Sequence, residues 1–299
     1  MLKHRLFLLL MLVLPLPVQA AFTVFACEPE WAALATEIGQ SHVKVITATT
    51  AQQDPHAIQA RPSLIAGLRK ADLLICTGAG LETGWLPLLQ RRANNPAVQN
   101  GQPGYVEVAS VVQMLDRPAS LDRVHGDVHA QGNPHIQTDP RNFIPAARLL
   151  SERLQQLDAE NAEAYRNNHA AFDERWRKAI VDWQQRAAPL QGMPVVVQHR
   201  SWVYLLHWLG LERVATLEKK PGLPPSSADL SALLAQLQQQ PARAILRAAY
   251  QNEQAARWLS ERSDIPVVEL PYTVGGNAES GNLFGLFDDT ITRLLTVQP

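Results

Sequence analysis

The chain has 299 residues, with 27 Lys and Arg against 28 Asp and Glu, and a formal net charge of -1 at pH 7. Basic residues are scattered along the chain, so there is no electrostatic footprint for nucleic acid or an anionic lipid surface. We therefore expect a small-molecule partner and no nucleic acid. We also expect a monomer. The length exceeds that at which single cores usually split, so we expect two domains.

Residues 1–20 read MLKHRLFLLLMLVLPLPVQA: a basic start, a leucine-rich stretch and a small-residue signal that ends at Ala20. This pattern predicts a secretory signal peptide, cut after Ala20, that directs the chain to the periplasm of a two-membrane bacterium. The stretch is too short for a stable membrane span, which requires about 20 apolar residues. The two cysteines of an exported chain, Cys27 and Cys76, fit one disulfide and two buried thiols about equally well.

The first half of the chain alternates strands with helices. The predicted strands are 23–27, 43–49, 72–76 and 105–109, and the predicted helices begin at Pro29, at Pro62 and near Trp85. Proline at a helix start, helical spacing of apolar residues and continuous apolar strands support this assignment. The pattern predicts an α/β lobe (residues 21–157) with a parallel sheet.

The second half repeats the scheme. Its predicted strands are 193–198, 213–218, 244–248 and 266–270, and its predicted helices are 201–209, 227–237, 251–260 and 282–295. We therefore expect a second, pseudo-symmetric α/β lobe over residues 189–299. The segment 158–188 between the lobes is polar and lacks Pro and Gly. It is either a surface helix of the second lobe or one long backbone helix that joins the lobes, and we favour the joining helix because of its length.

Two histidines follow a proline directly, in DPHAIQARP (54–62) and in GNPHIQTDP (132–140). His56 lies in the predicted loop after the second strand, His135 lies before a predicted helix start, and His199 ends the strand MPVVVQ. Ligands of open α/β sheets bind outside the carboxyl ends of the strands, so the three imidazoles can converge on one cleft. A preceding proline presents each side chain from a stiff loop. Three histidines suit Zn²⁺ or another borderline metal, although a single loop histidine is usually only hydrogen-bonded.

Four stretches carry a family resemblance: DPHAIQARPSLIAGLRKADLLICTGAGLE, NPHIQTDPRN, DAENAEAYRNN and QHRSWVYLLHWLGLERVATLEKKPGLPPS. They resemble the zinc- and manganese-binding proteins of ABC importers typified by ZnuA and TroA. The resemblance implies two α/β lobes joined by one long helix, with the metal between them on His56, His135 and His199. It also implies a periplasmic protein that delivers Zn²⁺ to a permease and its ATPase, with a periplasmic zinc chaperone as a further expected partner.

The fourth metal position is unassigned. Many relatives place a carboxylate after the strand that matches PVVEL, whereas this chain has Pro271 and Tyr272 there. We expect water in that position, with Glu269, Asp54 and Glu279 as weaker candidates. A histidine-dominated site favours zinc over manganese, which prefers oxygen ligands.

The segment DRVHGDVHAQ (122–131) carries His125, Asp127 and His129 just before the second Pro-His pair. It is either a solvated loop or a short capture loop that binds metal weakly and passes it inward, and composition alone does not separate the two.

Other functions of the protein remain open. A manganese or iron homologue, a periplasmic metallochaperone and an adhesin would share the site, whereas a secreted zinc hydrolase is disfavoured because the sequence lacks HExxH and G-x-S-x-G motifs.

Overall fold

The computed structural model describes residues 21–118, 129–220 and 222–297. The predicted signal peptide, residues 1–20, lies outside the described residues. Within the described ranges, no helix is both long enough and apolar enough to cross a bilayer.

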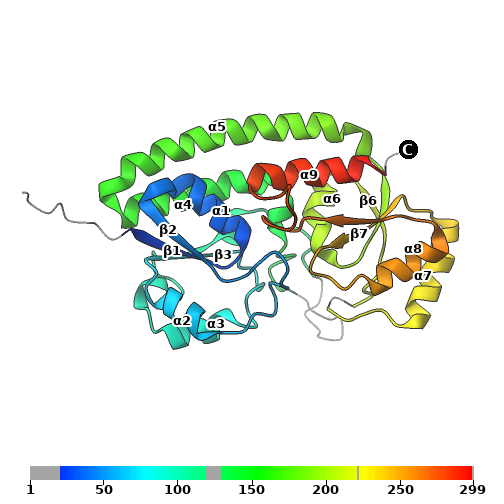
Figure 1. Ribbon diagram of the computed structural model, residues 1–299, viewed down its shortest axis with the longest axis horizontal. Helices are drawn as coiled ribbons and strands as arrows, with labels where there is room; N and C mark the ends of the chain where they lie inside the picture. Colours follow the sequence, from blue (N-terminus) through cyan, green and yellow to red (C-terminus); the bar gives the residue numbers. More distant parts are fainter. Residues whose placement is uncertain (1–20, 119–128, 221, 298–299) are drawn as a thin grey trace, which may run out of the picture.

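Two parallel four-stranded sheets form the centres of two lobes (Figure 1). The first sheet has the order β2-β1-β3-β4, and the second has the order β6-β5-β7-β8. The strands are β1 (Phe22–Ala26), β2 (Val43–Thr47), β3 (Leu73–Cys76), β4 (Tyr105–Glu107), β5 (Pro194–Val197), β6 (Glu212–Thr216), β7 (Ala244–Ala248) and β8 (Val267–Leu270). The two sheets therefore share one strand order, and the predicted pseudo-symmetric α/β fold is confirmed.

Helices flank both sheets. They are α1 (Pro29–Gly39), α2 (Pro62–Arg69), α3 (Leu86–Ala93), α4 (Phe143–Leu157), α5 (Ala162–Ala187), α6 (Val203–Leu209), α7 (Ser227–Gln239), α8 (Gln254–Ser263) and α9 (Leu283–Leu295). In the first lobe, α1 and α4 lie on the α5 side of the sheet, and α2 and α3 lie on the other side (Figure 1). Proline occupies the first turn of α1, α2 and α3, where its missing N–H costs no helical hydrogen bond.

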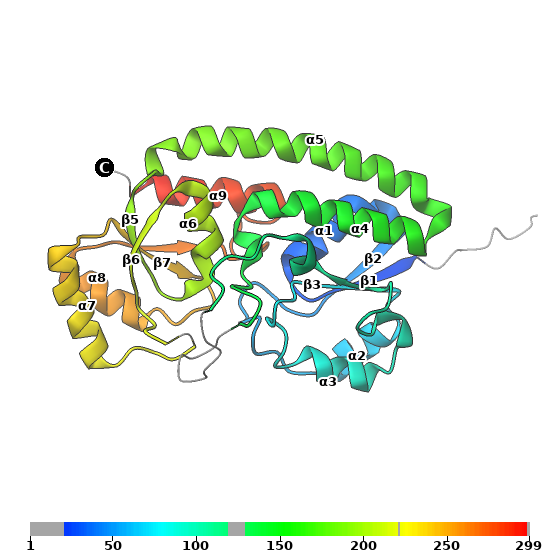
Figure 2. The ribbon, with the colours of Figure 1, turned by 180° about the vertical axis from the view of Figure 1, so that it is seen from behind.

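Helix α5 is the long joining helix, and its 26 residues run along both lobes (Figures 1 and 2). It begins at Ala162 rather than at residue 158, because residues 159–161 form a 3-10 turn. It contacts α1 and α4 of the first lobe and α9 of the second. The fold thus contains the expected backbone helix, whereas the exact lobe boundaries at residues 157 and 189 stay a prediction.

An aromatic cluster under α5 connects the two lobes. The Trp176 ring of α5 lies 5.3 Å from the Phe143 ring of α4 and 5.6 Å from the Phe287 ring of α9. The Trp183 indole N–H donates to Asp288 at 2.9 Å. Because one apolar cluster contains residues of both lobes, their relative motion is restricted near α5.

The disulfide that the sequence left open joins Cys27 and Cys76, whose Cα atoms are 4.8 Å apart. The two cysteines directly follow the paired residues Ala26 and Ile75 of β1 and β3. Both are fully buried, so the bridge fixes the carboxyl ends of two neighbouring strands beneath the loops that follow them.

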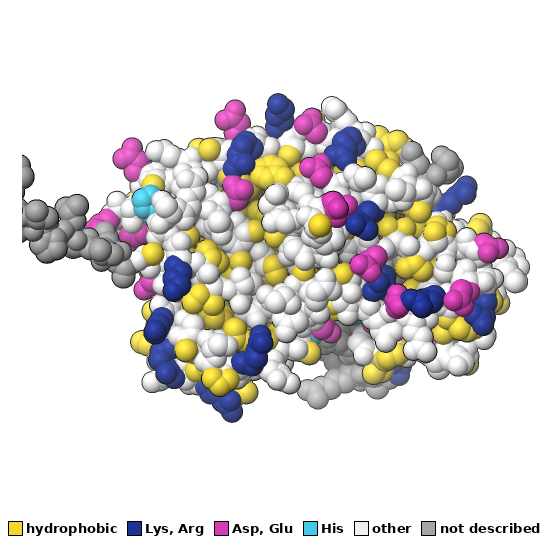
Figure 3. Space-filling model, viewed as in Figure 1, with side chains coloured by type: hydrophobic (Ala, Val, Ile, Leu, Met, Phe, Trp, Pro, Cys, Tyr) yellow, Lys and Arg dark blue, Asp and Glu magenta, His cyan; other side chains and the backbone are white. Residues whose placement is uncertain are grey.

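Charged side chains of both signs alternate along the upper edge of the molecule, where α5 runs (Figure 3). Three ion pairs in this region involve arginines of α5: Arg175–Glu37, Arg177–Asp173 and Arg186–Asp288. Such mixed, exposed pairs contribute little to stability and create no single-sign field along this helix.

Candidate metal centre

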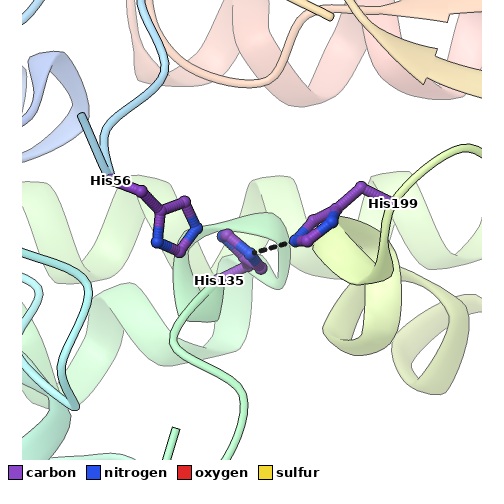
Figure 4. A group of neighbouring side chains, drawn as sticks. All are labelled: His56, His135 and His199. Carbon is purple, nitrogen blue, oxygen red and sulfur yellow. Dashed lines mark hydrogen bonds between the residues drawn. The ribbon is translucent and has the colours of Figure 1, made fainter. Parts of the chain in front are cut away.

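Three histidines from three separate loops meet between the lobes (Figure 4). His56 lies in the loop after β2, His135 lies just before the 3-10 turn Ile136–Thr138, and His199 lies after β5. One nitrogen from each ring lies within 4.8 Å of the corresponding nitrogens of the other two. The structure therefore brings together the three histidines that the sequence singled out.

The spacing of these nitrogens fits one small cation. The Nε2 atoms of His135 and His199 lie 3.4 Å apart. Two nitrogens bound tetrahedrally to one zinc, each at 2.0–2.1 Å, would lie about 3.3 Å apart. His135 and His199 already stand at the separation that a shared metal requires.

The two Pro-His loops contain the same type of hydrogen bond between an Asx side chain and the backbone. The side-chain oxygen of Asp54 accepts a hydrogen bond from the His56 N–H, and that of Asn133 accepts one from the His135 N–H, both at 3.0 Å. An Asx side chain that bonds the backbone two residues on forms a tight turn, and the intervening proline fixes φ. The repeated Asx-Pro-His sequence therefore aims each imidazole from a rigid turn.

Hydrogen bonds to the Nδ1 atoms orient two of the rings. Glu218 follows β6, and its carboxylate lies 2.7 Å from His199 Nδ1. Because an ionised carboxylate can only accept a hydrogen bond, His199 carries its proton on Nδ1, and its Nε2 is available as a metal ligand. The Tyr272 hydroxyl lies 2.6 Å from His135 Nδ1. When His135 Nε2 binds metal, Nδ1 carries the proton and donates it to the Tyr272 oxygen.

Burial keeps His135 neutral. Its side chain is 1% exposed, and burial lowers the pKa of His135 well below its ordinary value of 6.5, helped by the nearby rings of His56 and His199. Burial also raises the pKa of Tyr272 well above 10, so its phenol stays protonated at neutral pH. A neutral imidazole is the form that binds metal.

The weaker fourth-ligand candidates lie outside this group of nitrogens. The Asp54 carboxylate accepts a hydrogen bond from the His56 N–H within its own turn, Glu269 pairs with Arg247, and Glu279 lies 3.8 Å from Arg293. In the described ranges, the other group with metal-ligand spacing is Cys27, Cys76 and Glu82, whose two sulfurs are already joined to each other. Among the described residues, the group of candidate ligand atoms at this site thus consists of three imidazole nitrogens.

The proposed capture loop is described only in part. His125 and Asp127 lie outside the described residues, whereas His129 stacks on His56 with ring centroids 5.3 Å apart. One histidine of this segment therefore lies in contact with a ligand of the candidate centre. The capture role stays a prediction.

Three buried carboxylates, Glu28, Glu30 and Glu82, interact with one another, and Glu28 and Glu30 also help to raise the pKa of Tyr272. The Thr273 hydroxyl, one residue after Tyr272, donates to Glu30 at 2.5 Å and so links the two lobes. Burial raises the pKa of Glu30 and that of Glu82 to about 7, and burial together with its two acidic neighbours raises the pKa of Glu28. Sequence reasoning missed this cluster, although Glu28 and Glu30 directly follow Cys27 at the end of a predicted strand.

Sequence reasoning also missed the two orienting residues. Glu218 ends the predicted strand 213–218, and Tyr272 follows the predicted strand 266–270. Both stand at carboxyl ends of strands beside β5 or β7, which is the signal that could have found them. From the sequence, Tyr272 is recognisable only as a residue at the position where a carboxylate is expected.

Comparisons with known proteins agree with this architecture. Residues 24–297 match the family ZnuA, described as "Zinc-uptake complex component A periplasmic". The chain is 27% identical over 220 residues to the high-affinity zinc uptake system protein ZnuA of Paracoccus denitrificans (strain Pd 1222), covering 60% of this chain and 61% of that protein. It is 23% identical over 240 residues to the manganese ABC transporter substrate-binding lipoprotein PsaA of Streptococcus pneumoniae, covering 78% and 74%.

Solved structures share the fold. A crystal structure of ZnuA superposes with a TM-score of 0.77 at 19% identity, covering 94% of this chain and all of the other. A periplasmic metal-binding protein from Candidatus Liberibacter asiaticus superposes with a TM-score of 0.74 at 17% identity, covering 93% and 99%. Since the family match extends over nearly the whole chain, the protein belongs to the ZnuA family of periplasmic metal-binding proteins of ABC transporters.

Proposed function

We propose that this chain binds one Zn²⁺ as cargo on His56, His135 and His199 and delivers it to an ABC importer. The observation that carries the proposal is the convergence of three imidazoles, two of them with Nε2 atoms 3.4 Å apart. Glu218 and Tyr272 hold the His199 and His135 rings by their Nδ1 atoms and leave the Nε2 atoms for the metal. Water completes a tetrahedral shell in the fourth position.

The ligand chemistry supports zinc over manganese. Imidazole nitrogens suit zinc, whereas manganese prefers carboxylate, carbonyl and water oxygens. Glu218 approaches the centre but is engaged with His199 Nδ1 and with the Gly222 N–H. Relatives of both kinds match the chain, one named for zinc uptake and one for manganese, so the similarity favours neither metal and the proposal of zinc rests on the ligand set.

A direct competition tests the metal. Metal-stripped protein is titrated with Zn²⁺ and with Mn²⁺ against a chromogenic chelator. We expect zinc to bind tighter by roughly 100-fold or more, in line with the affinity order of divalent metals at nitrogen sites. His207, which is exposed and contacts Arg141, provides a control, since His207→Ala removes an imidazole that does not belong to the group of proposed ligands. Tighter binding of manganese would overturn the zinc proposal.

The transport role is tested in cells. The family comprises solute-binding proteins rather than enzymes, so we expect no hydrolase activity from the zinc-loaded chain. A strain that lacks the gene should accumulate less zinc when the metal is scarce, and the wild-type gene should restore uptake whereas His199→Ala should not. Full uptake without the gene would indicate a metallochaperone or adhesin instead. If the signal peptide is cut as proposed, the mature protein in the periplasm begins at Ala21.

A further inference from the structure

A pocket with a volume of about 570 Å³ opens beside the histidines. Two proposed ligands line it, His56 from the first lobe and His199 from the second, together with Asp54 and Glu218. His135 lies outside the lining, so the pocket adjoins the centre on the side of His56 and His199. A ligand in this pocket would meet a metal held by the three imidazoles.

The pocket is larger than a bare ion requires. Once three imidazoles hold a zinc ion, a single water completes its shell, and a water molecule takes about 30 Å³. Pockets for small organic molecules have volumes of about 300–1,000 Å³. The volume beside the centre therefore fits an organic molecule that binds with the metal.

One wall of the pocket is apolar. It is lined by Pro224, Pro225, Leu230, Ala255 and Trp258. Neither zinc nor its hydration water gains from contact with such a wall, because hydrated ions prefer polar surroundings. An apolar or aromatic side chain of an organic ligand would bury its surface against Leu230 and the Trp258 ring.

The polar side of the pocket offers acceptors. Gln198 is 6% exposed, and its Nε2 donates to the Asn252 carbonyl. Its Oε1 is buried and has no hydrogen-bond partner in the structure. Asp54 and Glu218 add carboxylates, and the described residues that line the pocket include no Lys or Arg. A ligand with N–H donors satisfies this side, whereas a free carboxylate would lack a cation unless it bound the metal itself.

We infer that the pocket holds a small amino-acid chelator that replaces the water on the zinc and expands its shell from four ligands to five, so that the cargo is a zinc–chelate complex. The chelator's amine nitrogen and carboxylate oxygen bind the metal in place of water, its N–H groups face Gln198, and its side chain lies against Trp258. The inference rests on the proposed three-histidine zinc site. Free L-histidine, with an amine, a carboxylate and an aromatic ring, is the probe of this chemistry.

Equilibrium dialysis with radiolabelled L-histidine tests the inference. Metal-stripped and zinc-loaded wild-type protein are dialysed against the probe, and protein-bound zinc and label are counted in the same sample. We expect one histidine per bound zinc and none on the metal-free protein. Glycine, which chelates zinc but has no side chain for the apolar wall, should be retained more weakly.

Two variants locate the ligand. Trp258→Ala should lower histidine retention by roughly tenfold or more, because an aromatic wall is lost, while zinc affinity measured without histidine stays as in wild type. Leu223→Ala changes an exposed side chain of the neighbouring loop that does not line the pocket, and should alter neither quantity. Equal histidine retention in Trp258→Ala and wild type would overturn the assignment to this pocket.

The outcomes distinguish a failure of the chelator inference from a failure of the proposed zinc-binding function. Bound zinc without retained histidine or glycine would overturn the chelator and leave the three-histidine site standing, with the pocket as an entry route only. Histidine that removes zinc from the protein, so that both leave together, would also overturn it. Failure of the wild type to bind zinc without any chelator would overturn the proposed function itself.

Discussion

His135 and His199 lie with their Nε2 atoms 3.4 Å apart, although 64 positions separate them in the chain and they come from different lobes. Tyr272 holds the far side of the His135 ring, and Glu218 holds the far side of the His199 ring. Both imidazoles are therefore fixed before a metal arrives. Such preorganisation lowers the ordering cost of binding and raises affinity.

Removing the hydroxyl of Tyr272 tests this arrangement. Tyr272→Phe keeps the ring in its buried place but leaves the Nδ1–H of metal-bound His135 without an acceptor. We expect zinc affinity to fall by about 10- to 100-fold, the usual effect of losing a partner of a metal-binding histidine. Tyr165→Phe is the matched control, because Tyr165 is also buried and its hydroxyl bonds Asp158, which does not belong to the histidine group. Equal zinc affinity in both variants would rule out an orienting role for Tyr272.

The buried carboxylates predict an unusual pH dependence of stability. The folded-state pKa of Glu30, raised by burial to about 7, exceeds the unfolded value near 4.5. Between those values the folded state binds more protons, so this group lowers the free energy of unfolding as pH rises. Glu30→Gln removes the charge, and its stability advantage over wild type should grow from about pH 4.5 to about pH 7 and then level off, reaching on the order of 1–3 kcal/mol.

Urea unfolding of metal-free wild type and Glu30→Gln across this pH range measures that advantage. Glu152→Gln, which alters an exposed glutamate paired with Arg148, should show no such growth. An advantage of Glu30→Gln that is the same at pH 5 and pH 8 would mean that Glu30 is ionised throughout.

The disulfide should contribute stability without affecting the metal. Replacing Cys27 and Cys76 together by alanine removes a covalent crosslink between residues that are 49 positions apart in the sequence. Chain-entropy arguments assign such a crosslink about 2–4 kcal/mol. We expect urea unfolding at a correspondingly lower concentration, with zinc affinity retained because neither sulfur belongs to the histidine group. An unchanged unfolding midpoint would contradict a structural role for the bridge.

If residues 122–131 form a capture loop, they should affect the rate of metal loading rather than the affinity at equilibrium. Changing His125 and His129 to alanine leaves His56, His135 and His199 in place, so the affinity of the main site should stay nearly unchanged. Loading from a competing zinc donor should slow, because a second, weaker site raises the local metal concentration. Stopped-flow loading measures the rate. A large loss of equilibrium affinity would instead place His129, which stacks on His56, in the coordination shell.

The sequence predicted the sheets well because the strands of each lobe are short apolar runs bounded by turn residues. It predicted that the three histidines converge because two Pro-His loops and one strand end present them at the carboxyl edges of parallel sheets. The start of α5 was placed four residues too early, since the 3-10 turn 159–161 has the same composition as the helix. Tyr272 and Glu218 could not be assigned because their partners depend on how distant strands lie side by side.

Zinc titration of wild type and of the single variants His56→Ala, His135→Ala and His199→Ala, by competition with a chelator, tests the central claim most directly. Each variant should retain the wild-type fold by circular dichroism, because each lobe has its own sheet and flanking helices. Each should lose more than the roughly 10- to 100-fold expected for an orienting partner, because a metal ligand itself is removed. Wild-type zinc affinity in His199→Ala would contradict the three-histidine site.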